Sequence, residues 1–295
     1  MKFSITPYSF HLHHYAGQMD VFTMIATVKH RYRLDAIDMW NPMMLSITDT
    51  NYLGKIKEAL AREDMTICNY AVDGANIWDP DPVIRKRNAD FYLENAKAAE
   101  FLGAKTIKID TGAFYLPHFC FAWDYDPKIQ KRNTGAYPQN PTEAEQKAFE
   151  ENRYYTDEML EYFSKKLSEY CKRADDMGYE IVLENHWGPM CVASELVKVI
   201  KACEHPKLGI LSHLGRWFGP DAKKAEEIVA PYTRYIHIDR VAADKGQGLA
   251  DLAKPYLDLG YDGYWGVEYI EESEDEFAIV DFILAQARRR LNPKK

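Results

Sequence analysis

The sequence has few cysteines, and none of them stands in a pattern that builds a disulfide framework or a zinc finger. Its five cysteines are an odd number and form no C-x-x-C pair. This usage is typical of a reducing compartment with buried or free thiols. No run approaches the ~18 apolar residues of a membrane span. The first residues, MKFSITPYSF, lack the apolar core of a signal peptide. We therefore expect a cytoplasmic protein.

Basic residues are also in short supply. The chain has 37 Lys and Arg against 45 Asp and Glu, which gives a net charge of −8. Nucleic-acid binding depends on basic side chains that neutralise phosphates, so this balance argues against DNA or RNA as the main partner. The glycine-rich phosphate loop of dinucleotide-binding sheets is missing after the first apolar run, where Tyr8-Ser9-Phe10 and histidines stand instead. Because no linker or low-complexity tract divides the sequence, we expect one domain, residues 1–295.

What the sequence does contain is a regular alternation of short apolar runs with longer amphipathic ones. Near-continuous apolar runs are typical of parallel strands that are buried on both faces. Eight such runs occur, at residues 2–7, 34–40, 65–71, 105–110, 179–185, 208–213, 234–239 and 264–270. Eight strand–helix units in a chain of this length predict an α/β fold with a single (β/α)8 TIM barrel. In the last predicted helix, apolar residues recur at helical spacing and should pack on the barrel exterior: Phe277, Val280, Ile283, Leu284, Ala287 and Leu291.

The connection after the fourth predicted strand is unusually long. Residues 111–140 are rich in aromatic side chains, namely Phe114, Tyr115, Phe119, Phe121, Trp123, Tyr125 and Tyr137. Connections of this length are usually functional or disordered, and the aromatic density argues against disorder. We predict that this segment covers the barrel mouth or contacts another subunit. A self-packed surface excursion is the alternative.

Four predicted strands end in a carboxylate or an imidazole. They place Glu184 in IVLEN, His213 in ILSH, His237 in YIHID and Glu268 in GVEYI. Active sites of TIM barrels lie at the C-terminal strand ends and are built from several strands. A carboxylate within an apolar strand is normally paired or metal-bound, because burying it alone is costly. A lone histidine at such an end is more often structural, but the four residues together predict a divalent-metal site.

With these four residues, the chain resembles the xylose-isomerase-like barrel superfamily. This superfamily includes sugar phosphate isomerases/epimerases, ketose 3-epimerases, inosose dehydratases, C-glycoside deglycosidase catalytic subunits and endonuclease IV. The resemblance runs from the PYSF after the first strand to the Glu-Tyr of the eighth. The sugar epimerases use Glu, Asp, His and Glu ligands on strands five to eight, which implies Glu184, His237 and Glu268 as the first, third and fourth. His213, in the turn HLGR, stands where these relatives have Asp.

That replacement changes the charge of the implied centre. Two carboxylates and two neutral imidazoles balance a 2+ ion, whereas three carboxylates and one imidazole leave an excess negative charge. A neutral centre is the stronger Lewis acid and should stabilise a developing enediolate better. More nitrogen ligands also move the metal preference from Mg²⁺ toward Mn²⁺, Fe²⁺, Co²⁺ or Zn²⁺. We favour Mn²⁺ as the cofactor. Alternatively, His213 is not a ligand and the site is degraded.

Further candidates follow from their position near strand ends. His186 lies two residues after Glu184 and therefore on the same side of the strand. It is a candidate catalytic residue that polarises a substrate oxygen or transfers a proton near neutral pH. Asp239, two residues after His237, could orient an imidazole or contact the substrate. The other candidates for substrate binding are Tyr8, His11, Trp40, Asp73, Lys108, Asp110 and Arg216.

The run His11-Leu12-His13-His14 leaves a different metal barrel open. An H-x-H after the first strand also occurs in amidohydrolase-type barrels, which need in addition a Lys or Glu bridge on strand four and an Asp on strand eight. Lys108 and Glu268 meet this requirement only loosely. We therefore treat His11 or His13 as a possible substrate contact.

The resemblance implies that Glu184 and Glu268 act as the acid and base of a sugar isomerase or epimerase. One removes the proton next to a carbonyl, and the other returns it to the resulting enediolate. The same enolate can instead expel a β-substituent, which would make the protein a lyase or dehydratase acting on a 3-keto-sugar or 3-keto-glycoside. The aromatic segment 111–140 would then stack on an aglycone.

A non-catalytic sugar-binding subunit with a weakened metal site is a further alternative. An endonuclease is not expected, because it would need a basic face. We expect a small carbohydrate as substrate and a homo-oligomeric protein, or a hetero-oligomer with a second subunit if the chain is a deglycosidase.

Overall fold

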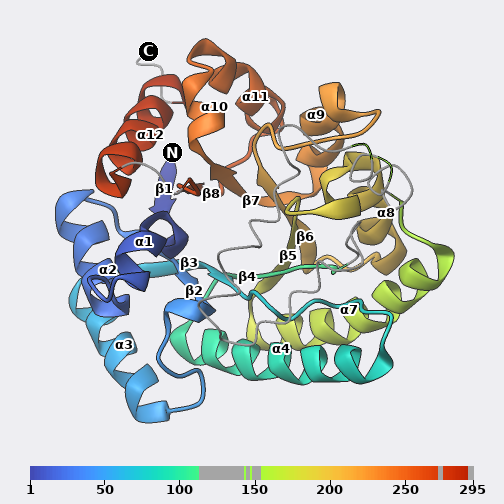
Figure 1. Cartoon of the computed structure of the whole chain (residues 1–295), viewed down its shortest axis with the longest axis horizontal. Helices are drawn as coiled ribbons and strands as arrows, with labels where there is room; N and C mark the ends of the chain where they lie inside the picture. Colours follow the sequence, from blue (N-terminus) through green and yellow to red (C-terminus); the bar gives the residue numbers. More distant parts are fainter. Residues whose placement is uncertain (113–142, 144–146, 148–153, 272–274, 292–295) are drawn as a thin grey trace.

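Eight parallel strands form the centre of the molecule. The computed structural model describes residues 1–112, 143, 147, 154–271 and 275–291. The strands are β1 (Lys2–Ile5), β2 (Ala36–Trp40), β3 (Thr66–Ala71), β4 (Thr106–Ile109), β5 (Glu180–Glu184), β6 (Leu208–His213), β7 (Thr233–Ile238) and β8 (Tyr264–Val267). They pair in the order β1-β8-β7-β6-β5-β4-β3-β2. Because β1 and β2 are also in contact, the sheet is a nearly closed barrel (Figure 1). The predicted TIM barrel is confirmed.

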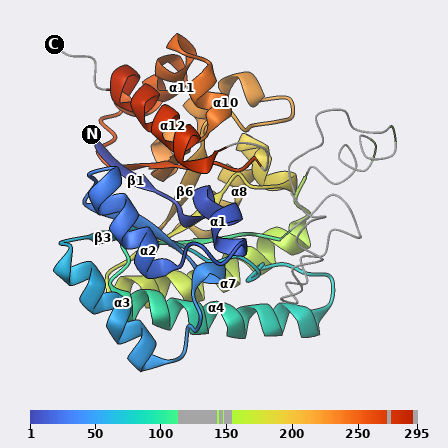
Figure 2. The ribbon, with the colours of Figure 1, turned by 60° about the vertical axis from the view of Figure 1, so that its left-hand side comes forward.

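Helices surround the strands on the outside (Figures 1 and 2). The α-helices are α1 (His11–Tyr15), α2 (Val21–Ala26), α3 (Thr50–Arg62), α4 (Pro82–Leu102), α7 (Asp157–Met177), α8 (Ala193–Cys203), α9 (Ala225–Val229), α10 (Arg240–Asp244), α11 (Gln247–Asp258) and α12 (Glu276–Leu291). Short helical turns are η1 (Pro7–Phe10), η2 (Thr27–Arg31), η3 (Asn41–Met43), η4 (Gly188–Cys191), η5 (Ala222–Lys224) and η6 (Ala230–Tyr232). Among the described residues, no helix is both long enough and apolar enough to cross a membrane.

Local sequence signals explain where the long helices begin and end. The Asp81 side chain accepts a hydrogen bond from the backbone N–H of Val83 at 2.8 Å, and Pro82 occupies the first helical position of α4. Gly103 and Gly178 follow α4 and α7 with φ of +79° and +83°, a conformation that glycine adopts without strain. The predicted strands agree with the observed ones to within three residues at each end.

The core has two parts, one outside and one inside the barrel. The larger part lies between strands and helices and includes five predicted residues of α12: Val280, Ile283, Leu284, Ala287 and Leu291. Phe277 packs against it and is partly buried. The smaller cluster comprises Ala36, Cys68, Val182, Leu211 and Tyr235, which lie on five different strands and fill the barrel interior. Because side chains alternate along a strand, residues two positions further on point the same way.

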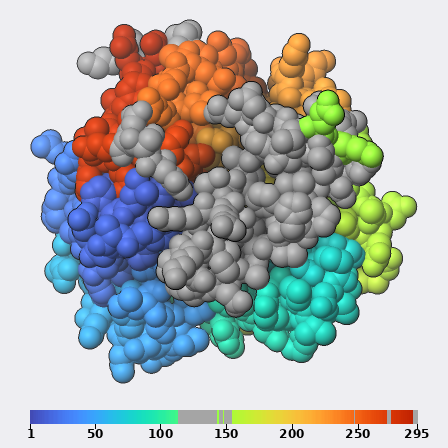
Figure 3. Space-filling model, in the orientation of Figure 1, coloured from blue at the N-terminus to red at the C-terminus, as the bar shows by residue number. Residues whose placement is uncertain are grey.

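The first and last parts of the chain lie against each other. Figure 3 shows the N-terminal residues next to the C-terminal helices on one face of the molecule. The buried carboxylate of Glu276 accepts hydrogen bonds from the backbone N–H groups of Leu12 (2.8 Å) and His13 (3.1 Å), and it also contacts His13 Nδ1. The H-x-H run is therefore tied to α12. Residues 113–140 of the predicted aromatic segment lie outside the described residues.

Candidate metal centre

The four predicted ligands come together at the C-terminal ends of neighbouring strands. Glu184 and His213 are the last residues of β5 and β6, His237 is the penultimate residue of β7, and Glu268 directly follows β8. One ligand atom of each lies within 4.8 Å of the others. Strand parity explains this convergence, because three of the four stand two positions after interior residues, namely Val182, Leu211 and Tyr235.

The same ring nitrogen of both histidines faces both carboxylates. His213 Nδ1 lies 3.3 Å from Glu184 Oε1 and 3.3 Å from Glu268 Oε2. His237 Nδ1 lies 3.5 Å and 3.4 Å from these same oxygens. It is buried and makes no hydrogen bond to any residue that the structure describes. A cation shared by the four groups would satisfy this atom, and two carboxylates with two imidazoles form a donor set that suits a divalent transition metal.

The other nitrogen of each imidazole faces a buried aspartate. His213 Nε2 lies 3.3 Å from Asp239 Oδ2, and His237 Nε2 lies 3.2 Å from Asp38 Oδ2. Such carboxylate–imidazole pairs fix the ring orientation and tautomer of metal-binding histidines. Burial would lower the pKa of His213, but the hydrogen bonds with Asp239 and Glu184 outweigh burial and raise it. Both rings are thus held with Nδ1 toward the cluster.

Asp239 has no free carboxylate oxygen. Oδ1 accepts from the backbone N–H of Ala242 at 2.8 Å and caps α10, while Oδ2 is bonded by the guanidinium of Arg216 and faces His213. The residue is fully buried. This position suits the orienting role rather than direct contact with a substrate. Arg216 is partly exposed and reaches the site through Asp239.

Asp38 is a site residue that sequence reasoning missed. It lies on β2, and its Oδ1 accepts a hydrogen bond from the Tyr235 hydroxyl and lies 3.2 Å from Cys68 Sγ. Oδ2 faces His237 Nε2. The available signal was the single carboxylate within the otherwise apolar run AIDMW, which is the same signal that identified Glu184.

Charge neighbours keep both glutamates ionised. Burial alone would raise the pKa of Glu184, but the nearby His186 and Lys108 hold it well below the usual value. Burial acts on Glu268 in the same way, and His237 overcomes it and lowers the pKa. Ionised carboxylates can bind a cation or accept a proton, so Glu184 and Glu268 are in the charge state that both roles require.

Gly266 allows β8 to approach the histidine ring. A Cβ atom at this position would lie 2.8 Å from His237 Cδ2 and 2.9 Å from the Tyr235 hydroxyl oxygen. Both contacts are too short for carbon, so a larger residue would displace the imidazole. Glycine at 266 therefore helps to place His237.

Asn185 joins the strand ends that carry Glu184 and His213. Its side chain accepts from the His213 backbone N–H at 2.6 Å and donates to the His213 carbonyl at 3.0 Å. Asn185→Ala leaves the buried His213 N–H without this partner and leaves its carbonyl with the longer bond from the Arg216 N–H. We expect it to lower the free energy of unfolding by about 1–3 kcal/mol. Denaturant unfolding of the metal-free protein measures this loss.

The matched control is Asn51→Ala, at an exposed position of α3, which should change stability by less than about 0.5 kcal/mol. Equal stability of the two variants would contradict the bracing role of Asn185.

The predicted catalytic residue His186 and the other predicted substrate contacts lie beside the cluster in two groups. Asp73, Lys108, Asp110 and His186 form a charged group next to Glu184, with His186 Nδ1 3.9 Å from Glu184 Oε2. Tyr8, His11 and Trp40 form an aromatic group. The Tyr8 ring stacks on His11 at 4.5 Å between centroids and meets Trp40 edge-on at 5.1 Å.

The aromatic and charged groups are connected. Trp40 Nε1 donates a hydrogen bond to Asp73 Oδ2 at 2.7 Å. His11 is almost fully buried, and its Nδ1 lies 2.7 Å from the Tyr8 carbonyl. Trp40 therefore connects Tyr8 to Asp73 of the charged group, whereas His11 packs against the Tyr8 ring.

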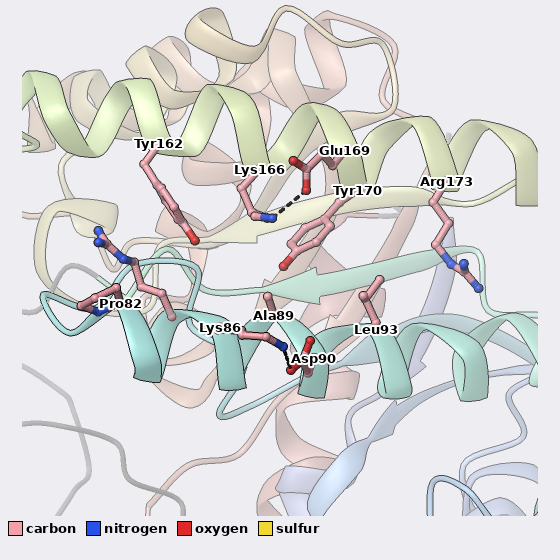
Figure 4. Close-up of a pocket in the computed structure, with 11 residues that line it drawn as sticks. Pro82, Lys86, Ala89, Asp90, Leu93, Tyr162, Lys166, Glu169, Tyr170 and Arg173 are labelled. Atoms are coloured by element: carbon pink, nitrogen blue, oxygen red, sulfur yellow. Dashed lines mark hydrogen bonds and ion pairs between the residues drawn. The ribbon is translucent and has the colours of Figure 1, made fainter.

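A groove of about 460 Å³ lies elsewhere, on the outer side of the barrel between α4 and α7 (Figure 4). Its charged side chains are largely paired, with Lys86 bonded to Asp90 and Lys166 to Glu169, both at 2.6 Å. The residues that line this groove include none of the four ligand-type residues. The groove is therefore separate from the candidate site at the strand ends.

Comparisons with known proteins agree with the fold. No curated protein matches the chain in sequence. Similar solved structures include an L-ribulose 3-epimerase, with 12% identity, a TM-score of 0.69 and coverage of 99% of this chain and 95% of the other. A 3-keto-D-glucoside 4-epimerase from E. coli, in its apo form, has 14% identity, a TM-score of 0.66 and coverage of 97% and 98%. A probable 3-DHS dehydratase involved in petrobactin synthesis from Bacillus anthracis has 12% identity, a TM-score of 0.64 and complete coverage of both chains.

At such identities these likenesses show the fold alone. A family model carries the assignment further, because the model of the xylose isomerase-like TIM barrel matches residues 32–284. This match spans most of the chain and includes all four ligand-type residues. The chain therefore belongs to the xylose isomerase-like TIM-barrel family.

Proposed function

We propose that the protein is a divalent-metal-dependent isomerase or epimerase that removes a proton next to the carbonyl of a keto-sugar. The observation that carries this proposal is the meeting of two ionised glutamates and two oriented histidines within 4.8 Å. The names of two structural neighbours, an L-ribulose 3-epimerase and a 3-keto-D-glucoside 4-epimerase, support a keto-sugar as the substrate class.

Glu184, His213, His237 and Glu268 would hold the ion, with Mn²⁺ as the favoured metal. A bound divalent ion supplies a Lewis acid that stabilises negative charge on substrate oxygens. With Nε2 of each ring turned to Asp239 or Asp38, the two histidines would offer Nδ1 to the ion and release any proton on that atom as the ion binds. With two carboxylates, the resulting centre carries no net charge.

The two glutamates differ in what surrounds the oxygen turned away from the histidines. Glu184 Oε2 lies 3.2 Å from the Lys108 ammonium, whereas Glu268 Oε1 lies 3.4 Å from the Thr6 hydroxyl. Glu268 is also the more exposed of the two side chains, at 14% against 5%. We therefore assign the first proton removal to Glu268 and the proton return on the other side to Glu184.

The direct test is solvent-deuterium uptake. The metal-loaded protein is incubated in D₂O with a panel of ketoses and 3-keto-glycosides, and exchange is read by mass spectrometry and NMR. An epimerase or isomerase should give a deuterated product of otherwise unchanged composition, and chelation should stop the exchange. A protein that binds Mn²⁺ but exchanges no proton of any substrate in the panel would contradict the proposal.

A second candidate function is β-elimination from a 3-keto-sugar or 3-keto-glycoside. His186 favours it, because this partly exposed imidazole lies next to Glu184 and could protonate a leaving oxygen. The neighbour described as a probable 3-DHS dehydratase also supports it. Product analysis separates the two functions, because elimination releases water, an alcohol or an aglycone together with an unsaturated ketone.

His213 should determine the metal preference. His213→Asp replaces a neutral nitrogen donor with a charged oxygen, which favours Mg²⁺ relative to Mn²⁺. We expect the ratio of the Mg²⁺ dissociation constant to the Mn²⁺ dissociation constant to fall roughly tenfold. Competition titrations of the metal-free protein measure the ratio. His30→Asp, at an exposed histidine, is the control and should leave it unchanged. If His213→Ala binds Mn²⁺ as tightly as the wild type, His213 is not a ligand.

A further inference from the structure

A second group of ligand-type side chains lies beside the first at the ends of β3, β4 and β5. It consists of Asp73, Asp110 and His186, and one ligand atom of each lies within 4.8 Å of the others. Two carboxylates and an imidazole at this spacing are the ligands that a divalent ion uses in proteins. In this protein the space between them already contains a positive charge.

That charge is the ammonium of Lys108. Its Nζ lies 2.9 Å from Asp73 Oδ1, 3.0 Å from Asp110 Oδ2 and 3.1 Å from His186 Nδ1. The side chain is only 2% exposed. The nitrogen thus lies among all three ligand atoms, where a metal ion would have to sit.

Glu184 extends across both groups. Its Oε2 lies 3.2 Å from Lys108 Nζ, and its Oε1 faces His213 and His237 at 3.3 and 3.5 Å. A carboxylate with one oxygen directed to each of two cation positions has the arrangement of a bridge in a two-metal site. Here one of the two positions is filled by a side chain.

We propose that Lys108 is a built-in cation that occupies a second, otherwise metal-competent position, so that each wild-type chain takes a single divalent ion. This inference rests on the proposed function only in that Glu184 is a ligand of that ion. Lys108 then acts as a positioning residue, because it holds one oxygen of Glu184 and leaves the other for the metal.

The electrostatics of the cluster support a permanent cation. The ammonium lies 2.9 Å from Asp73 Oδ1, 3.0 Å from Asp110 Oδ2 and 3.2 Å from Glu184 Oε2, so carboxylates surround it on three sides. Removing the ammonium would leave three carboxylates close together and largely buried, which is strongly unfavourable without a counter-ion. A divalent ion entering the vacated position would restore the balance.

The experiment compares metal stoichiometry in the full chain. Lys108→Met keeps an apolar side chain of similar length and removes the charge. Metal-free protein is saturated with Mn²⁺, freed of excess ion and analysed for manganese per chain. We expect one ion in the wild type and two in Lys108→Met. In the electron paramagnetic resonance spectrum, the two ions should be spin-coupled, since ions in two-metal sites lie about 3.5–4 Å apart.

Two control variants and one double variant test whether the second ion takes the position of the Lys108 ammonium. Lys105→Met removes an exposed lysine at the other end of β4 and should keep one ion. Lys108→Arg retains a cation and should also keep one. The double variant Lys108→Met with Asp110→Asn removes a ligand of the new position and should return the ratio from two to one.

Two results would overturn the inference. One is a folded Lys108→Met that still takes one ion, and the other is a wild type that takes two. If Lys108→Met is insoluble, Lys108→Ala purified with Mn²⁺ replaces it under the same criteria. A wild type that takes no Mn²⁺ would overturn the metal centre of the proposed function as well, whereas a ratio of one in both proteins overturns this inference alone.

Discussion

Glu268→Gln is expected to reduce turnover by about 10³-fold while leaving the fold unchanged, because an amide cannot accept the substrate proton. The glutamine has the same shape, and its side-chain oxygen can still face His213 and His237. Steady-state kinetics on the substrate found by deuterium exchange measure the loss, and circular dichroism checks the fold. Metal analysis separates loss of the base from loss of a ligand. Glu227→Gln, at an exposed position of α9, is the control.

Comparison with Glu184→Gln tests the order of the two proton transfers. If Glu268 removes the proton first, Glu184→Gln should still exchange deuterium into the substrate while forming little product. Glu268→Gln should lose both exchange and product formation when the reaction starts from the same epimer. More than a tenth of wild-type turnover in metal-loaded Glu268→Gln would contradict its role as the base.

The barrel could be predicted because its strands are buried on both faces and therefore appear as apolar runs. The apolar runs do not define where the strands end, since hydrogen bonding continues past the last regular residue. The backbone N–H of Glu268 still donates to the Ile238 carbonyl at 3.0 Å, although β8 ends at Val267. Irregular register also escapes the sequence, as between Ile37 and Asp38, where the pairing of β2 with β3 shifts.

The four ligand-type residues could be identified because parity and strand ends are local properties. Their orientation depends on contacts between distant parts of the chain. Asp38 and His237 are 199 positions apart, and no local sequence pattern predicts their contact. Lys108 was identified as a residue near a strand end, but only the distances from its ammonium to four surrounding groups show how it is engaged. Sequence reasoning thus predicted that the four ligand-type residues come together and missed several of the residues that orient them.

The contacts that orient the two histidine rings can be tested at Asp38. Replacing Asp38 by Asn should weaken Mn²⁺ binding by about 10–100-fold. In the metal-loaded protein the Asp38 carboxylate would accept the proton of His237 Nε2, which leaves Nδ1 for the ion. An asparagine is neutral, and if its NH₂ group faces the ring, the proton moves to Nδ1 and blocks that atom. Even with its oxygen toward the ring, the amide stabilises the imidazole less well than the carboxylate does.

The affinity is measured by competition with a chelator at constant pH. Asp35→Asn, an exposed residue just before β2, should bind as the wild type does. Asp239→Asn should act on His213 as Asp38→Asn acts on His237, so both variants should weaken binding. Because the two histidines face the same two glutamates, the double variant should bind Mn²⁺ more weakly than either single variant, by a factor that need not be the product of the two. Wild-type affinity in Asp38→Asn would mean that the ring of His237 is held by its packing against Gly266 and Tyr235 rather than by the carboxylate.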